Sequence, residues 1–410
     1  MKIAELVAPT RFGRSFRWLL GSSVISNAGD GIALAAGPLL VASVTQDPVL
    51  VASAAFLLRL PWLLFGVVAG AYVDRLDRRH LIIAVDVFRA FVLAVLTVTV
   101  MTGVVNITLV LIAMFVLGTA ETFADIATST LLPSVVGSAD LGIANARMQG
   151  GFLVTNQLIG PPIGALLFAA GRSWPFVATV VCCLLGALLM LRVSVRPVAV
   201  VERRSVRHEI AEGIQWLWNH AAMRTLAFTI VLFNVTFGAA WSVLVLYSTH
   251  VLHMSEFGFG LLITAGAVGG LIGTTAYGWL ERHLSLAAIM RIGLVIETFT
   301  HLTLALTRQP WVAVLVMVVF GAHAFVWNTT STTIRQRAVP GDLLGRVTSV
   351  YMIGLIGGLV VGTALGGVLA DVWGLRAPFW FGFFGSGALV LLLWRELGHI
   401  AHAGEAPLPV

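Results

Sequence analysis

Charged side chains are scarce in this 410-residue chain. Asp, Glu, Lys and Arg make up 11% of its residues, whereas a soluble globular protein has about 25%. Hydrophobic residues make up 58% of the chain, and its mean hydropathy is +0.95. The shortage of charge excludes an ordinary soluble domain and predicts that much of the chain faces lipid.

Lysine and cysteine are almost absent. The only lysine, Lys2, follows methionine, so the chain has no Gly-Lys pair, and this excludes a Walker-type ATP-binding loop. Cys182 and Cys183 are adjacent in an apolar run, which is neither a disulfide framework nor a metal site. His250 and His253 have no acidic or cysteine ligand set nearby. We therefore expect no metal and no cofactor.

The formal net charge of +6 raises the question of nucleic-acid binding. The arginines are spread among short loops instead of being gathered on one soluble face, so we expect no nucleic-acid partner.

Twelve apolar segments are long enough to cross the ~30 Å hydrocarbon core as helices. They lie at approximately 16–43, 48–73, 80–103, 106–132, 140–169, 173–193, 222–250, 256–280, 285–306, 310–335, 342–371 and 375–396. The sequence therefore predicts an all-α integral membrane protein with 12 transmembrane helices. We expect bundles at 1–193 and 222–410, joined by a linker at 194–221.

Positive charge predicts the orientation. Most Lys and Arg residues lie in segments on the same side as the N-terminus, whereas the opposite loops hold Arg172, Arg308 and Arg376. The positive-inside rule then places both termini in the cytoplasm of a bacterial cell, with the helices in its inner membrane. The linker is predicted to form an amphipathic helix on the inner membrane surface. Its apolar face holds Val206, Ile210, Ile214, Leu217 and Trp218.

The two halves of the chain repeat. Asn27 and Asn234 are 207 residues apart, and Glu121 and His323 are 202 apart. A five-residue deletion in the second half explains the change of offset. The repeat predicts two pseudo-symmetric six-helix bundles, with binding near the midplane and rocking about a fixed site. We expect a monomer.

The loop after the second span carries a charged signature. The run Gly70-x-x-x-Asp74-Arg75, with Arg78 and Arg79 behind it, resembles the loop signature of the major facilitator superfamily of secondary transporters. The segment from 341 to 347 is similar to the superfamily's exporter branch, which includes macrolide-efflux and enterobactin-export proteins.

The resemblance implies a gate. We expect Gly70 to allow close helix approach. Asp74 and its neighbouring arginines should hold the cytoplasmic side closed against Asp342 and Arg346, at the start of the eleventh helix.

A second resemblance lies in the fifth span. The run Gly160-Pro161-Pro162-Ile163-Gly164-Ala165 is a partial form of the Gly-Pro-x-x-Gly-Gly motif that is associated with antiporters. Ala165 stands where that motif has its last glycine.

Charged residues inside the spans are functional candidates, because burying them in a membrane is costly. Asp30 and Arg59 lie at similar depths on the first two helices, so we expect them to pair. The pair is either a static ion pair or a proton-sensitive carboxylate with a changing partner.

Glu121 and His323 occupy equivalent depths on helices four and ten, which line the cavity in the superfamily. Facing each other across the cavity, they could bind a proton, a cation or a polar substrate group. The alternative is that each has its hydrogen-bond or ion-pair partner within its own bundle. Asp125 is a further proton-coupling candidate, although we favour a structural pair with Arg147.

Other polar residues have assigned places. We expect Asp86 and Arg89 to join a cytoplasmic charge network, and Glu297 to pair with His301. The residues that we expect in the substrate cavity are Asn27, Arg59, Asn156, Gln157, Asn234, Trp241 and Asn328.

The interpretation that these features favour is a secondary transporter driven by protons. We expect it to export a hydrophobic or amphipathic small molecule, such as a drug, a macrolide or a siderophore-like compound. The alternative is uptake or facilitated transport of a small metabolite. A membrane-embedded enzyme lacks support, because the chain has no nucleophile–base motif and no soluble catalytic domain. A sensor would need an output domain.

Overall fold

The computed structural model describes residues 10–73, 76–137, 140–195, 206–341 and 343–401. Within these ranges the chain is helical and has no strand. Ten helices are long and apolar enough to cross a membrane, and the two shorter apolar helices Trp174–Met190 and Ala377–Leu393 bring the described set to twelve. The predicted all-α membrane fold is confirmed.

The first six spans follow the predicted segments closely. They are α2 (Gly13–Val44), α3 (Pro48–Val73), α4 (Arg78–Met101), α5 (Ile107–Val135), the α6–α7 stretch (Leu141–Phe152 and Gly160–Ala170) and α8 (Trp174–Met190). A short 3-10 turn, η1 (Thr10–Phe12), precedes α2.

The second six spans also follow the predicted segments closely. They are α10 (Ala221–Ser242) with its short continuation α11 (Leu244–Leu246), α12 (Glu256–His283), α13 (Leu286–Leu306), α14 (Pro310–Ala338), α15 (Leu344–Trp373) and α16 (Ala377–Leu393). Two helices lie outside the spans, namely α9 (Val206–Asn219) and α17 (Glu396–Ala401).

The packing of the chain divides it into two units. Unit 1 comprises Met1–Gln46, Ala54–Val201 and Met254–Thr264, and unit 2 comprises Asp47–Ser53, Glu202–His253 and Ala265–Val410. Each unit thus includes a short stretch from the opposite half of the chain.

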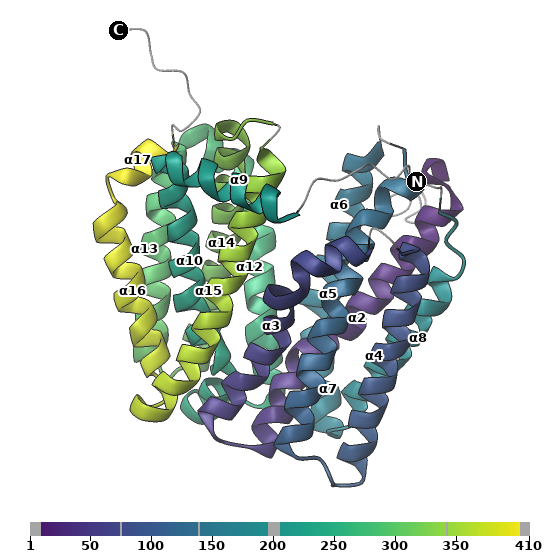
Figure 1. Ribbon diagram of the computed structural model, residues 1–410. Coiled ribbons are helices and arrows are strands. Elements are labelled where there is room, and N and C mark those ends of the chain that lie inside the picture. The colour runs from purple at the N-terminus through teal and green to yellow at the C-terminus, as the bar shows by residue number, and fades with distance from the viewer. Residues whose placement is uncertain (1–9, 74–75, 138–139, 196–205, 342, 402–410) are drawn as a thin grey trace, which may run out of the picture. The chain divides into compact units, whose positions relative to one another are not determined.

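In unit 1, α2 packs against α7 and α8, and α4 packs against α5 and α8. An apolar cluster that includes Phe16, Leu19, Leu131 and Met190 fills one end of this unit. In unit 2, α10 lies beside α15 and α16, and α13 lies beside α14 and α16 (Figure 1).

Glycine allows the closest helix contacts in unit 2. A Cβ atom on Gly358, Gly362 or Gly366 of α15 would collide with a backbone oxygen of α10. Along α12, Gly269 and Gly273 meet the backbone of α14 in the same way. Helix backbones approach this closely only where side chains are absent, so these glycines set the packing distance between the helices.

Two spans contain π-helical turns, which the sequence did not indicate. They are η3 (Leu153–Ile159), between α6 and α7, and η4 (Tyr247–Val251), after α11. Proline explains part of the first. An α-helix would bond the N–H of residue 162 to the carbonyl of Leu158, but Pro162 has no N–H. The hydroxyl of Thr264, which also belongs to unit 1, donates to that carbonyl at 3.2 Å.

The predicted amphipathic helix is present as α9. It packs against α15, where a Cβ on Gly213 would collide with the backbone of Arg346. Leu217 is buried, whereas Ile214 and Trp218 remain 48% and 58% exposed. Part of the predicted apolar face therefore covers unit 2, and the rest is free to contact lipid.

Candidate proton-coupling and gating sites

A buried ion-pair network joins α2 and α4 in unit 1. The guanidinium of Arg89 donates to the Asp30 carboxylate through Nη2, and its Nη1 lies 3.5 Å from Asp86 Oδ1. The exposed fractions of the Arg89 and Asp86 side chains are only 8% and 3%. Gly186 of α8 leaves room beside Asp86. One arginine thus connects two carboxylates inside the helix bundle.

Two predictions are corrected here. Asp30 pairs with Arg89 and not with Arg59, which is exposed. Asp86 and Arg89 lie in this buried network instead of in a cytoplasmic one. The position of Arg89 along its helix could have indicated this. Arg89 lies 11 residues after Arg78, where α4 begins, and so ~17 Å along the axis, which is too deep for a network at the cytoplasmic surface.

Further carboxylates lie within electrostatic range of this network. Glu121 of α5 interacts with Asp30, Arg89 and Arg59. Asp125, one turn along α5, interacts with the same three and with Glu121. We call these residues the unit 1 charge cluster; they are Asp30, Arg59, Asp86, Arg89, Glu121 and Asp125.

The unit 1 charge cluster has more acids than bases. Its four carboxyl groups face two guanidinium groups, so full ionisation would leave a formal charge of about −2 in a low-dielectric bundle. Among the described residues, no ion pair joins Asp125 to Arg147, and Arg147 Nε is buried without a hydrogen-bond partner. The expected structural pair of Asp125 and Arg147 is therefore wrong.

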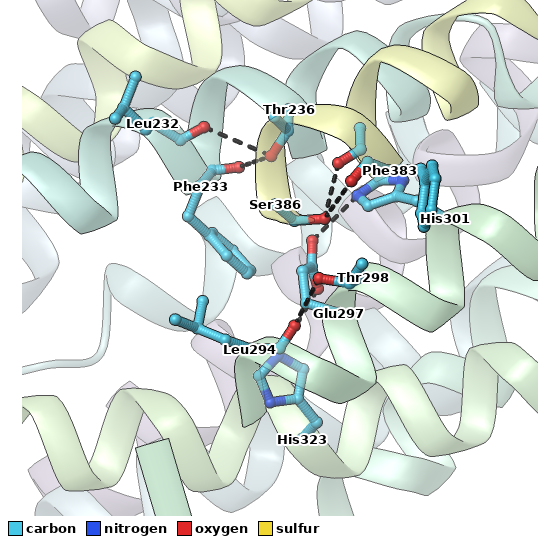
Figure 2. A network of polar contacts seen from close by, with 11 residues as sticks. Leu232, Phe233, Thr236, Leu294, Glu297, Thr298, His301, His323, Phe383 and Ser386 are labelled. Carbon is cyan, nitrogen blue, oxygen red and sulfur yellow. Dashed lines mark hydrogen bonds and ion pairs between the residues drawn. The ribbon is translucent and has the colours of Figure 1, made fainter. Parts of the chain in front are cut away.

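His323 belongs to a different buried group, in unit 2. Glu297 of α13 accepts a bond from His301 Nε2 at 3.0 Å, which confirms the expected pair. The second carboxylate oxygen lies 3.5 Å from His323 Nε2 on α14. The sequence did not indicate this third member. Figure 2 shows both imidazoles converging on the Glu297 carboxylate, and we call these three residues the unit 2 triad.

The predicted cavity residues of unit 1 are partly engaged with one another. Asn27 donates to Ser23 O at 2.8 Å. The Asn156 amide lies 3.5 Å from Asn27 O, and the Gln157 amide lies 3.5 Å from Asn156 Oδ1. Asn156 and Gln157 both lie in the π-helical turn η3, a feature often found at functional sites.

The predicted cavity residues of unit 2 differ in their surroundings. Asn234 is buried and donates to Ile230 O at 2.8 Å. Trp241 packs against Phe237 and Phe320, with ring centroids 4.3 Å and 5.0 Å away. Asn328 is exposed.

The two described arginines of the loop signature hold the ends of neighbouring helices. Arg78 Nη1 donates to Thr130 O at 3.3 Å. Arg79 donates through Nε to Met190 O at 3.2 Å and through Nη2 to Leu191 O. The signature therefore binds α4 to the ends of α5 and α8.

Other gating residues are accounted for as follows. Asp74, Arg75 and Asp342 lie outside the described residues. A Cβ on Gly70 would meet no described atom within 4 Å, so the close approach expected at this glycine is not found. Arg346 pairs with Glu212 of α9 at 2.5 Å, inside unit 2.

Asp77, which lies within the signature just before Arg78, caps α4. Its carboxylate accepts from the backbone N–H groups of Arg79 and His80 at 2.9 Å and 3.1 Å. Partial desolvation acts to raise the pKa of Asp77, but these bonds and the His80 ring lower it more, so its pKa lies below the ordinary 3.8.

The antiporter-like motif forms a helix contact. A Cβ on Gly160 would collide with Gly31, and one on Gly164 would collide with the carbonyl of Ile32. Pro161 stands in the first turn of α7, where a missing N–H is tolerated. The motif therefore presses α7 against α2, the helix that carries Asp30.

The twelve spans and their embedded charges define the class as a multi-pass membrane transporter. The family model described as "Transmembrane secretion effector" matches residues 5–396. The chain belongs to this family, a branch of the major facilitator superfamily.

Named relatives are exporters. The chain is 30% identical to the multidrug efflux pump Tap of Mycolicibacterium fortuitum over 385 residues, which cover 88% of this chain and 90% of Tap. It is 25% identical to the enterobactin exporter EntS of Salmonella typhimurium over 310 residues, or 72% of each chain.

The fold is similar to that of a bacterial homologue of the iron transporter ferroportin, solved in an inward-facing state. The TM-score is 0.75 at 18% identity, with 95% of this chain and 98% of that chain covered.

Proposed function

We propose that this protein is a proton-coupled exporter of a hydrophobic or amphipathic small molecule, working by alternating access in a bacterial inner membrane with both termini inside. The observation that carries the proposal is the acid surplus of the unit 1 charge cluster. Two arginines cannot neutralise four carboxyl groups, so the cluster lowers its charge by taking up protons. The exporter relatives Tap and EntS support the direction of transport.

The coupling role falls to Glu121, with Asp30 and Asp125 as further candidates. Arg89 already holds Asp30, whereas Glu121 has no ion-pair partner within 4 Å among the described residues. Glu121 is only partly buried and Asp125 is exposed, so both are reachable by water if this face of unit 1 lines a hydrated cavity. A proton on Glu121 leaves more positive charge around Arg89 and favours a different conformational state.

Bundles 1–193 and 222–410 are the two moving bodies of this proposal, and 194–221 joins them. The polar side chains of both units would then line the substrate path. The loop signature, with Asp342 and Arg346, is proposed to close the cytoplasmic side.

The test is transport in proteoliposomes under an imposed pH gradient. Ethidium, a macrolide and enterobactin serve as probes, and the protein is inserted with its cytoplasmic side outward. Inward accumulation in vesicles that are acidic inside is expected. Accumulation that ignores the pH gradient would refute proton coupling, and accumulation only in the opposite sense would favour uptake.

Glu121→Gln should abolish accumulation against a gradient while leaving substrate exchange, because only the coupling charge is lost. Asp371→Asn is the matched control, since Asp371 is exposed at the end of α15. If Glu121→Gln, Asp30→Asn and Asp125→Asn each concentrate substrate with the wild-type pH dependence, the unit 1 charge cluster does not carry the proton.

A further inference from the structure

The unit 2 triad is sealed inside its own bundle. The side chains of Glu297 and His301 are 0% exposed and that of His323 is 1% exposed. Glu297 lies 11 residues into the 21-residue α13, and His323 lies 13 residues into the 29-residue α14. The three groups therefore meet near the middle of both spans, far from either helix end.

Among the described residues, no ion pair joins the triad to a charged side chain outside it. The titratable groups that act most strongly on Glu297 are His301 and His323. Phe233, Phe320 and Trp327 surround the His323 ring, with centroids 6.1–6.4 Å away.

Charges on the surrounding helices are engaged elsewhere. Arg291 of α13 donates to Trp394 O at 2.9 Å, and Arg224 of α10 donates to Trp218 O at 2.7 Å. Glu281 of α12 lies 3.4 Å from Arg337 of α14. The sequence of α16 contains no charged residue.

Other charges on these elements also lie apart from the triad. Arg335, further along α14, stacks over the Tyr351 ring at 4.1 Å. Glu396 of α17 lies 3.5 Å from His399, and Arg282 of α12 donates to Gly278 O.

The charge of the triad depends on its protons. With a charged carboxylate and two neutral imidazoles it carries −1, one added proton brings it to zero, and a second would bring it to +1. A buried site of low dielectric disfavours either net charge. His301 Nε2 bonds to Glu297, whereas His301 Nδ1 is buried and has no hydrogen-bond partner among the described groups. This nitrogen is free to take the single neutralising proton.

Two glycines shape the space for the rings. A Cβ on Gly382 of α16 would overlap the His301 ring, and a Cβ on Gly293 of α13 would overlap the His323 ring. Both imidazoles are thus held against backbone that offers no side chain. A resident metal ion suits the site poorly, because the Glu297 oxygens already contact the two Nε2 atoms directly, at 3.0 Å and 3.5 Å. Within the described residues, no group of three or more His, Cys, Asp or Glu side chains is placed to hold a metal ion.

We propose that Glu297, His301 and His323 form a one-proton binding site inside unit 2, separate from the unit 1 charge cluster. The site accepts a proton from water in one transport state and returns it to water in another. This inference rests on the proposed function for its role in transport, but the binding of the proton is a property of the protein itself.

The test counts protons on the purified protein, without transport. Potentiometric titration between about pH 5.5 and 9 should show that wild type takes up about one proton per molecule more than Glu297→Gln, because the variant triad is already neutral. Glu256→Gln is the matched control. Glu256 is exposed and lies outside the triad, so the count should equal that of wild type.

A second measurement covers the case in which Glu297→Gln does not fold. Nitrogen-15 NMR of the histidines in wild type should show one buried imidazole gaining a proton over this range, with the signal assigned by His301→Gln and His323→Gln. Equal proton counts in wild type and Glu297→Gln, or imidazole signals of the triad that do not change with pH, would overturn the site.

Transport separates this inference from the proposed function. If the triad does not titrate while accumulation still follows the pH gradient, the inference fails and the proposed function stands. If the triad titrates but accumulation ignores the gradient, the site exists and the proposed function fails.

Discussion

The two units differ in the residues that lie beside their membrane-embedded carboxyl groups. Unit 1 places four carboxyl groups around two arginines, and part of that cluster is exposed. Unit 2 places one carboxylate between two imidazoles, and the group is sealed. Arginine stays charged at all working pH values, whereas histidine changes its charge near neutrality. The repeat thus preserves helix packing while its charged groups have diverged.

The largest expected effect comes from removing the fixed cation of unit 1. Arg89→Leu removes the cationic partner of the partly buried Asp30 and of the buried Asp86, which should cost about 3–5 kcal/mol of stability. Thermal unfolding in detergent measures the loss. Arg89→Leu/Asp30→Asn removes one of the stranded charges, so it should recover part of the stability. A double variant no more stable than Arg89→Leu would show that Asp30 is not the carboxylate that Arg89 neutralises.

The next prediction tests whether packing is equivalent in the two units. Gly164→Ala and Gly366→Ala, which are 202 residues apart, place a Cβ against the carbonyls of Ile32 and Ala239. Each should cost about 1–3 kcal/mol. Gly278→Ala meets no atom within 4 Å and should be neutral or slightly stabilising, because alanine favours the helix. If one glycine tolerates alanine and the other does not, the contact between α7 and α2 and the contact between α15 and α10 are not equivalent.

The third prediction compares the titratable groups through the pH dependence of transport. Glu121→Gln should remove the response to a pH gradient. His323→Gln should retain it with a shifted midpoint, since Glu297 and His301 still form a group with one exchangeable proton. A shift of one pH unit corresponds to about 1.4 kcal/mol. An unshifted pH profile in His323→Gln would separate His323 from proton binding.

The smallest effect compares equivalent helix caps. Asp77 caps α4, and Ser285 caps α13 by accepting from Ala288 N at 3.2 Å. Replacing either with alanine should cost ~1 kcal/mol. The pKa of Asp77 is lower in the folded protein than its ordinary 3.8. Its contribution is therefore present above about pH 4 and is lost as pH falls through the lower folded value.

The control for this comparison is the Ser285 cap, whose contribution should be independent of pH because a hydroxyl does not titrate in this range. Unfolding of Asp77→Ala, Ser285→Ala and wild type at several pH values would measure both. A stability difference between Asp77→Ala and wild type that stays constant down to about pH 2 would contradict the capping role of the carboxylate.

The sequence by itself determined the fold class, the twelve spans and the repeat. Hydrocarbon thickness fixes the length of an apolar helix, and missing backbone partners in lipid leave the helix as the available structure. Glu297 and His301 were paired correctly because residues four apart share a helix face. The amphipathic α9 was recognised for the same reason, since its apolar residues recur with the helical period.

Only the tertiary structure decided the partners between helices. Because the first two spans are neighbours in the sequence, we expected Asp30 to pair with Arg59. In the structure α2 and α4 both pack against α8, and Arg89 of α4 donates to Asp30 of α2 instead. His323 lies beside Glu297, and the absence of a side chain at Gly293 and Gly382 leaves room for the His323 and His301 rings. Depth along a helix can be counted from the sequence, whereas the direction in which a side chain faces its neighbour depends on how the helices rotate and pack. That rotation is set by many small contacts, and no short motif encodes it.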